Sequence, residues 1–304
     1  MSDSTAADRE AKDRGLGGSF ALGSWRVHRI GYGAMQLAGD GVFGPPRDRD
    51  EALRVLRAAV DSGVNHIDTA QYYGPGVVNE LIREALYPYP ADLAIVSKVA
   101  ARRGADGAVL PFDEPSQLRR GIEDNLETLG VGRLAAVNLR ALDQSAPGHQ
   151  FDVRLAALIQ ARDEGLIDGI GLSNVSRQQL LRATDQTEIV CVQNLFNLAD
   201  QRSLDVLEEC TRQGIAFVPF CPLGWPQDVR SQILNSSVLA ELGARLRATP
   251  VQIALAWLLD LAPNILLIAG TRTRTHLSEN LDTANVELDD AARAELAKIF
   301  PTVR

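Results

Sequence analysis

The sequence predicts one (β/α)₈ barrel, an α/β fold in which eight parallel strands are surrounded by helices. From about residue 29 onward, short apolar runs alternate with longer segments of helical period, which is the pattern of parallel strands joined by crossover helices. The alternation repeats eight times within 304 residues, and no Pro/Gly/Ser-rich linker divides the chain. These observations favour a single barrel over a doubly wound sheet with a second domain.

Each expected strand is a short run of β-branched and apolar residues, followed by a segment of helical period. The eight runs cover residues 29–35, 64–70, 93–99, 134–140, 167–174, 188–194, 215–221 and 264–270. Residues 1–18 are charged and have no long apolar run, so we expect a flexible N-terminal tail followed by one barrel domain at 19–304.

Two of the expected crossover helices have recognisable features. After the first strand, Leu53, Leu56 and Val60 fall on one face, as in an amphipathic helix. After the third strand, Ser116 is the expected N-cap and Gly130 the expected left-handed residue at the helix end.

The segment GYGAMQ at 31–36 tests the competing Rossmann fold. It supplies a GxG after a strand, but Gln36 stands where the dinucleotide fingerprint needs its third glycine. The barrel is therefore favoured, and a barrel builds its active site at the carboxyl ends of the strands.

The composition points to a small-molecule ligand. A net charge of -8 and a pI near 5.1 argue against nucleic acid or an anionic membrane as a partner, and no run approaches the ~20 apolar residues of a membrane helix. Cys191, Cys210 and Cys221 are odd in number and lack CxxC spacing, which suits a reduced, cytoplasmic protein. The scattered histidines predict no metal site. The oligomeric state stays open, and a monomer is compatible with the sequence.

Lys98 is one of only three lysines among 31 basic residues, and it interrupts an apolar strand. Its ammonium would be partly desolvated and would need a carboxylate partner or a lowered pKa. Asp68 ends the neighbouring strand and supplies such a partner, although Asp is also a common helix N-cap. Tyr73 follows in a short loop, where a nearby cation would lower its pKa and suit it to donate a proton.

Six motifs occur in order, and together they resemble the aldo-keto reductases. They are HIDTAQYYG at 66–74, VSK at 96–98, GLSNV at 171–175, VQNLFN at 192–197, PLG at 222–224 and HLSEN at 276–280. The resemblance as a whole runs from about residue 20 to the C-terminus. The resemblance implies an NADPH-dependent reductase of aldehydes or ketones. In that family a tyrosine protonates the alkoxide that forms as hydride is delivered.

The resemblance implies a role for four residues. Tyr73 would be the general acid, Lys98 would lower its pKa, and Asp68 would pair with Lys98. Arg140 stands at the end of the fourth strand, where the family usually has a histidine. An arginine there can polarise a carbonyl, but it cannot shuttle a proton because it is never neutral. A strand-end arginine that only reaches solvent is the competing interpretation.

The resemblance also implies a cofactor site around the carboxyl ends of the strands. Residues matching those that bind the nicotinamide end are Ala34, Met35, Asp68, Ser173, Asn174, Gln193 and Phe220, the last as the stacking ring. Residues matching the loop over the pyrophosphate are Cys221, Pro222, Leu223 and Gly224. Residues matching the adenosine end are Gly270, Thr271, Glu279 and Asn280.

Cations near the start of the last barrel helix would explain a preference for NADPH. Arg272 and Arg274 in GTRTRTH are the expected ligands of the 2′-phosphate, and His276 is a weaker candidate. Two solvated surface arginines remain the competing interpretation in this arginine-rich chain.

A bacterial branch of the family that includes pyridoxal reductases looks most similar, through GYGAMQLAG, VFGPPRDR, LYPY and VNLR. This makes pyridoxal or another aromatic aldehyde the expected substrate, with Phe43, Tyr72 and Trp225 as the residues that would line its site. Two other functions stay open. One is an NADPH-binding sensor or scaffold with little turnover, and the other is a Schiff-base aldolase that uses Lys98.

Overall fold

The computed structural model describes residues 15–144 and 148–299 of the chain. Residues 1–14, which make up most of the predicted tail, lie outside this part. The last residues of the predicted tail pack against the barrel instead of forming a flexible segment. Leu16 is buried, and its carbonyl accepts a hydrogen bond from the backbone N–H of Ile30 at 3.1 Å. Leu16 is thus already part of the packed structure, although the predicted barrel domain starts at residue 19.

Seven parallel strands form a curved sheet, and each overlaps one of the predicted strands. In their order around the sheet they are β3 (Tyr32–Gly33), β4 (His66–Asp68), β5 (Ala94–Arg103), β7 (Leu134–Arg140), β8 (Ile167–Ser173), β9 (Cys191–Leu195) and β10 (Ala216–Phe220).

The predicted eighth strand, residues 264–270, closes the barrel through isolated parallel bridges rather than a continuous ladder. Phe217 of β10 bridges Ile265, and Ile30 bridges Leu267. The backbone N–H of Leu267 also donates at 2.7 Å to the carbonyl of the residue before Ile30. One segment is therefore bonded to both edges of the sheet, and the predicted (β/α)₈ barrel is confirmed.

The closure depends on two glycines. A Cβ on Gly33 would lie 2.3 Å from the Ile268 carbonyl oxygen, and a Cβ on Gly270 would lie 2.3 Å from the Gly33 carbonyl oxygen. The first and last strands thus approach more closely than any side chain would allow.

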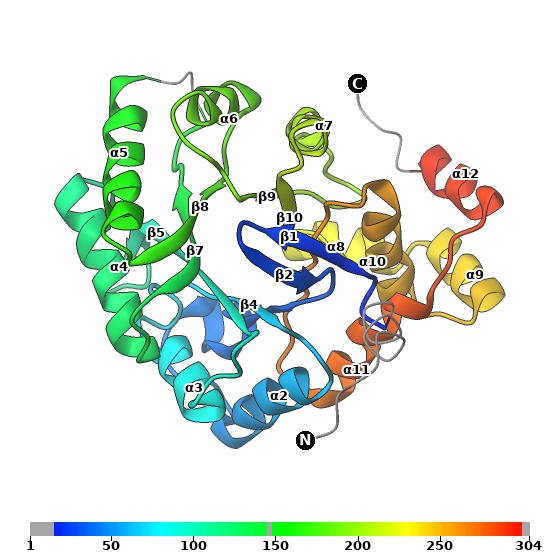
Figure 1. The fold of residues 1–304 in the computed structure, drawn as a ribbon. Helices are drawn as coiled ribbons and strands as arrows, with labels where there is room; N and C mark the ends of the chain where they lie inside the picture. Colours follow the sequence, from blue (N-terminus) through cyan, green and yellow to red (C-terminus); the bar gives the residue numbers. More distant parts are fainter. Residues whose placement is uncertain (1–14, 145–147, 300–304) are drawn as a thin grey trace, which may run out of the picture.

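Helices surround the sheet in a ring (Figure 1). They are α2 (Arg49–Asp61), α3 (Val77–Leu86), α4 (Pro115–Leu129), α5 (His149–Asp163), α6 (Arg177–Thr184), α7 (Leu204–Gln213), α8 (Gln227–Leu234), α9 (Ser237–Leu246), α10 (Pro250–Leu261), α11 (Arg274–Asp282) and α12 (Asp290–Ile299). Short 3₁₀ turns are η1 (Ala34–Leu37), η2 (Asp40–Val42) and η3 (Thr283–Asn285). Within residues 15–144 and 148–299, no helix is long and apolar enough to cross a bilayer.

The start of α4 differs from the sequence prediction. The N-cap is Glu114 rather than Ser116, and Glu114 forms a capping box with Gln117. Pro115 takes the first helical position, where its fixed φ suits the helix and its missing N–H costs nothing. At the other end, Gly130 has the predicted left-handed conformation, with φ 69° and ψ 36°.

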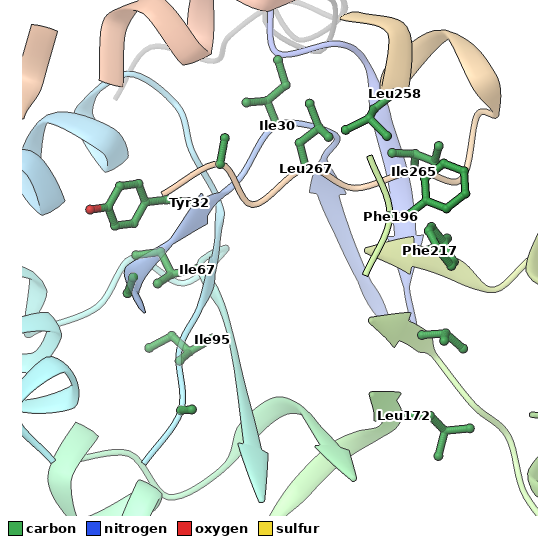
Figure 2. Packing of buried hydrophobic residues seen from close by; sticks show 14 of the residues in the cluster. Ile30, Tyr32, Ile67, Ile95, Leu172, Phe196, Phe217, Leu258, Ile265 and Leu267 are labelled. Atoms are coloured by element: carbon green, nitrogen blue, oxygen red, sulfur yellow. The ribbon is translucent and has the colours of Figure 1, made fainter. Parts of the chain in front are cut away.

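Successive strand residues point alternately out of the barrel and into it. Outward residues such as Ile67, Leu172 and Leu267 pack between the sheet and the helices, and Figure 2 shows Leu258 of α10 beside Ile265 in this layer. Inward residues form a second apolar cluster, with members Ala94, Val96, Ala136, Cys191, Ala216, Val218, Leu266 and Ile268.

Two hairpins that the sequence analysis did not predict are added to the barrel. β1 (Ser19–Leu22) and β2 (Trp25–His28) pair antiparallel, and their Leu22 and Val27 join the inward cluster. Figure 1 shows this hairpin lying across the middle of the barrel. The second is formed by β6 (Val109–Phe112) and the end of β5. The first covers the amino-terminal end of the strands, which leaves the carboxyl end for a ligand.

Candidate functional site

Three of the four predicted catalytic residues share the inward face of neighbouring strands. Lys98 continues the inward alternation of Ala94 and Val96, and Arg140 continues that of Ala136. Asp68 is paired in register with Val96, so it faces inward on β4. The period of two in the strands thus converts separate sequence positions into one cluster at the carboxyl end of the barrel.

Lys98 and Asp68 form a buried ion pair. Lys98 Nζ lies 2.5 Å from Asp68 Oδ1, and the two side chains are 3 % and 5 % exposed. The same ammonium donates to the Thr69 carbonyl at 3.0 Å, and Gln193 Nε2 donates to the other Asp68 oxygen at 2.8 Å. Both charges therefore have partners in a desolvated place, which is the condition for a stable buried pair.

Tyr73 packs directly against this pair. Its backbone N–H donates to the Ala70 carbonyl at 3.0 Å, in the turn that follows β4. Lys98 Nζ lies 5.0 Å from the centre of the Tyr73 ring. The Tyr72 ring packs edge-on against the Tyr73 ring, with 5.4 Å between the ring centres. The Tyr73 ring is only 7 % exposed, so the tyrosine is held rigidly beside the lysine.

The pKa of Tyr73 differs from the expectation that Lys98 lowers it. Burial raises the pKa of Tyr73 well above its usual range, and the negative charge of Asp68 raises it further. The charges that lower it belong to Arg140 and Arg103. Tyr73 is therefore protonated at neutral pH, which is the form that a proton donor needs.

Arg140 stands at the end of β7, in register with Ser173 at the end of β8. Its guanidinium lies over the Phe220 ring, 5.8 Å from the ring centre. Within residues 15–144 and 148–299, no carboxylate lies within ion-pair distance of it. Stacking on an aromatic ring holds the cation in place without neutralising it.

A floor of polar and small groups lies below Arg140 and was missed by the sequence analysis. Asn138 points inward one pleat earlier, and its Oδ1 is 3.4 Å from the sulfur of Cys191. A Cβ on Gly171 would fall 2.2 Å from the same oxygen, so only glycine fits there. The signal was present, because Asn138 shares the alternation that identified Arg140.

The residues at the ends of β8 and β9 fit the amide end of a nicotinamide. Ser173 Oγ is buried and has no hydrogen-bond partner in the described part of the chain. A buried hydroxyl without a partner costs free energy, and an amide would satisfy it. Asn174 has a left-handed backbone, φ 57°, and donates to the Ala141 carbonyl at 2.8 Å, while Gln193 donates to Asp68. Both amide side chains are thus already oriented beside Ser173.

The loop after β10 is tightly constrained. Cys221 has a positive φ of 50° and its carbonyl accepts from Asn197 Nδ2 at 3.2 Å. Gly224 has φ 98°, and a Cβ on it would lie 2.9 Å from the Arg230 nitrogen. The backbone of Arg230 therefore lies against the loop predicted to cover the pyrophosphate. The Arg230 side chain is half-buried, and burial lowers its pKa. The sequence analysis missed Arg230 because it is one arginine among many on a helix.

The predicted adenosine end gathers around the start of α11. The Arg274 guanidinium meets the Glu51 carboxylate at 3.2 Å, and Arg272 Nε donates to the Gln36 carbonyl at 2.8 Å. Both arginines are exposed, as a phosphate ligand requires, but both already face a carboxylate, since Arg272 Nη1 lies 3.8 Å from Asp40 Oδ1. Three of the other predicted residues form hydrogen bonds within the protein. The Thr271 carbonyl accepts from the Tyr32 hydroxyl, the Glu279 carboxylate accepts from the Thr249 hydroxyl, and Asn280 donates to the Ala269 carbonyl.

The predicted substrate residues are unequally placed. Tyr72 is buried against Tyr73, and its pKa is raised to about 12, mainly by burial. Phe43 is partly exposed and touches the turn of the β5–β6 hairpin, because a Cβ on Gly107 would lie 3.5 Å from its ring. Trp225 is 64 % exposed and makes no ring contact with a described aromatic residue. Ala34 and Met35 lie in η1, directly after β3.

One further arginine was not predicted at all. Arg103 ends β5, where the strand continues past Lys98 to pair with β6. Arg103 bonds the Gly107 turn that the Phe43 ring touches, and its charge is the smaller of the two that lower the pKa of Tyr73. Local sequence could not show this, because the extension of β5 depends on pairing with residues 109–112.

The sequence is similar to several known proteins. The chain matches the sequence model of the Aldo/keto reductase family over residues 29–300. It is 48 % identical over 281 residues to a pyridoxine 4-dehydrogenase of Escherichia coli strain K12, covering 91 % of this chain and 96 % of that protein. It is 35 % identical over 293 residues to an uncharacterized oxidoreductase of Schizosaccharomyces pombe, covering 96 % and 93 %.

Solved structures share the fold. A thermostable aldo-keto reductase, Tm1743, solved with the inhibitor epalrestat, superposes with a TM-score of 0.77 at 28 % identity, over 92 % of this chain and 99 % of that one. An aldo/keto reductase from Klebsiella pneumoniae, solved with NADP and acetate, gives a TM-score of 0.78 at 22 % identity, over 94 % and 96 %. Members of this family are oxidoreductases that use NADP(H), so the predicted enzyme class and cofactor are confirmed at the level of the family. The match to the family model over residues 29–300 and the relative at 48 % identity show that the chain belongs to the aldo-keto reductase family.

Proposed function

We propose that this protein reduces an aldehyde or ketone to an alcohol with NADPH, and that Tyr73 is the general acid. The observation that carries the proposal is the protonated, buried tyrosine packed against the Lys98–Asp68 pair. NADPH, when bound, supplies the hydride that reaches the carbonyl carbon. The Tyr73 hydroxyl then gives its proton to the carbonyl oxygen, because the alkoxide formed there is a stronger base than phenolate.

The other three residues support this proton transfer. Asp68 holds Lys98 through an ion pair, and Lys98 lies against the Tyr73 ring, where its charge meets the phenolate that remains. Arg140 carries a permanent charge at the neighbouring strand end, where it polarises the carbonyl. Its charge also favours the phenolate, because it lowers the pKa of Tyr73.

The residues proposed to hold NADPH are those of the predicted site. Ser173, Asn174 and Gln193 would bind the nicotinamide amide, and the orphaned Ser173 hydroxyl is the observation that supports this. Phe220 would stack on the ring, the loop at 221–224 would cover the pyrophosphate, and Arg272 or Arg274 would meet the 2′-phosphate.

The proposed substrate is pyridoxal or another aromatic aldehyde. The support is the 48 % identity to a pyridoxine 4-dehydrogenase, together with the aromatic side chain of Tyr72 beside Tyr73. The cytoplasmic location stays a prediction, supported by the free thiols of Cys191, Cys210 and Cys221.

The alternative of a Schiff-base aldolase is disfavoured by the bonds of Lys98. A nucleophilic lysine must be neutral, whereas Lys98 lies 2.5 Å from the Asp68 carboxylate and donates to the Thr69 carbonyl as well. Trapping of a carbonyl compound on Lys98 by borohydride would revive that alternative.

The test is NADPH oxidation with pyridoxal, simple aromatic aldehydes and ketones, measured on wild type and on Tyr73→Phe. We expect kcat to fall by about 10²-fold or more in Tyr73→Phe, because a positioned proton donor is lost. Tyr89→Phe is the matched control, since it removes a hydroxyl that bonds the Leu129 carbonyl away from the site. Near-normal activity in Tyr73→Phe would refute the assignment, and NADPH binding without turnover of any carbonyl would favour the sensor or scaffold.

A further inference from the structure

The β5–β6 hairpin carries an arginine, Arg103, at the carboxyl end of the barrel. β5 continues past Lys98, and Arg103 pairs in register with Val109 of β6. Arg103 Nη1 donates to the Gly107 carbonyl in the turn of the hairpin at 2.7 Å. The Phe43 ring lies against the same turn, and the carbonyl of Val42 before it accepts from the backbone N–H of Gly74, the residue after Tyr73, at 3.2 Å. Arg103 is thus fixed on a paired strand rather than on a mobile loop.

The Arg103 guanidinium is not neutralised. Its Nε is buried and has no hydrogen-bond partner in the described residues, and no described carboxylate lies within ion-pair distance of it. Many other arginines of this acidic chain are paired, such as Arg49 with Glu84 and Arg182 with Asp152. Arg103 instead shares with Arg140 the lack of a carboxylate partner among the described residues, so its charge is free to meet an anion.

An orphaned, buried N–H of a charged group destabilises the fold unless a ligand supplies the acceptor. The guanidinium is a planar fork that matches the oxygens of a carboxylate or phosphate. Arg140 already has a place beside Phe220, and Arg230 lies beside the 221–224 loop. Arg103 is the cation near Tyr73 to which the reduction itself gives no task.

We propose that Arg103 selects carbonyl substrates that carry an acidic group, a carboxylate or a phosphate, and holds that group while the carbonyl meets Tyr73. The inference rests on the proposed reductase activity and adds the chemical class of its substrate. Arg103 is a binding residue in this account, and the proton itself comes from Tyr73, whose pKa is lowered more by Arg140 than by Arg103.

The experiment compares acidic aldehydes with neutral counterparts of similar shape in the intact enzyme with NADPH. One pair is 4-carboxybenzaldehyde and methyl 4-formylbenzoate, and the other is pyridoxal 5′-phosphate and pyridoxal, which separates a carboxylate from a phosphate. The variants are Arg103→Gln, Arg103→Lys and Arg102→Gln. Arg102 is the matched control, because it is the exposed neighbour on the same strand and its loss changes the net charge equally.

We expect wild type to favour at least one acidic aldehyde over its neutral counterpart in kcat/KM. Arg103→Gln should raise KM for that acidic aldehyde by roughly 10- to 100-fold, the range for a lost charged hydrogen bond, and should affect the neutral one much less. Arg103→Lys should recover part of the preference, and Arg102→Gln should keep all of it.

The outcomes separate the two claims. If no carbonyl compound is reduced, neutral ones included, the proposed function fails. If the neutral aldehydes are reduced and neither acidic aldehyde is preferred, the reductase stands and the inference is overturned. It is also overturned if Arg103→Gln slows both members of a pair equally, which is the result expected of a residue that only holds the hairpin together.

Discussion

Lys98 donates to Asp68 at 2.5 Å while both side chains are almost fully buried. A charge left alone at such a place costs about 3–5 kcal/mol. We therefore expect Lys98→Met to lower the free energy of unfolding by roughly that amount, and Asp68→Asn plus Lys98→Met together to recover most of it. Urea denaturation measures the three stabilities. The double variant should stay inactive, so that regained stability without activity separates the two roles of the pair.

If the double variant were as unstable as Lys98→Met, the stability would depend on the packing of the lysine stem rather than on its charge. If Lys98→Met alone kept full stability, the buried pair would not be as desolvated as its exposure indicates.

Tyr73 also predicts the pH dependence of the reduction. Because burial and Asp68 raise the pKa of Tyr73 above its usual value near 10, its proton is present throughout the neutral and mildly alkaline range. We expect kcat/KM for reduction to stay level from about pH 7 to pH 9, and to fall only above the ordinary tyrosine pKa. A fall centred near pH 7 to 8 in steady-state rates would contradict this, because it would require a lowered pKa in the free enzyme.

The role of Arg140 can be tested by replacing it with the histidine that the family usually has at this position. Arg140→Ala should lower kcat by about 10²-fold, the effect of losing one donor to a developing oxyanion. Arg140→His should keep part of the activity and acquire a pH dependence near 6.5, because imidazole titrates there and guanidinium does not. Rate profiles from pH 5 to pH 9 measure both. Unchanged rates in both variants would remove Arg140 from the mechanism.

The fold was predictable because its signal is local and repeated. Each strand run carries its own alternation, so Asp68, Lys98 and Arg140 were placed at one end of the barrel before any contact was known. The eighth segment was recognised from its apolar run even though it makes only bridges. The N-terminal hairpin was missed because its apolar residues are few, and their burial depends on the inward faces of strands far along the chain.

The site was predictable in its residues and less so in its energetics. The direction of the Tyr73 pKa was wrong because sequence shows which charges are near but not how deeply a ring is buried. Arg103 was missed because β5 is extended only by its pairing with β6. The partner of Arg274 was missed because Glu51 lies at the other end of the chain.

The ion pair between Glu51 and Arg274 gives a prediction for cofactor affinity. Glu51 accepts from both the backbone N–H and the Nε of Arg274, so it competes with a 2′-phosphate for the same guanidinium. Glu51→Gln keeps a hydrogen-bond acceptor but removes the charge. We expect it to tighten NADPH by about two- to five-fold, the worth of an exposed ion pair, and to leave NADH unchanged. Fluorescence titration of both cofactors measures the two affinities.

The control is Glu84→Gln, which breaks a comparable surface pair with Arg49 away from the predicted phosphate site. It should change neither affinity. Equal tightening of NADPH and NADH by Glu51→Gln would show that the carboxylate acts on something other than the phosphate, and would leave Arg272 as the remaining candidate.

His66 makes stability depend on pH. The His66 side chain faces into the barrel, two residues before Asp68 on β4, and is 2 % exposed. It packs closely on Gly31, because a Cβ on Gly31 would lie 2.1 Å from the His66 ring. Burial, the largest cause, lowers the pKa of His66 to about 4. The unfolded chain takes up a proton near pH 6.5, whereas the folded chain does so only near 4. The free energy of unfolding should therefore fall by ~3 kcal/mol as the pH drops across this interval.

The interval between about pH 6.5 and 4.5 isolates this residue, because the carboxylates whose pKa values are lowered lose their contribution only at lower pH. Glu51, Asp152 and Glu209, for example, have pKa values of about 2. His66→Gln should flatten the pH dependence there in urea denaturation, whatever its stability at pH 7. His149→Gln, which replaces an exposed histidine, should keep the slope of wild type. A slope that persists in His66→Gln would mean that another buried group takes up the proton.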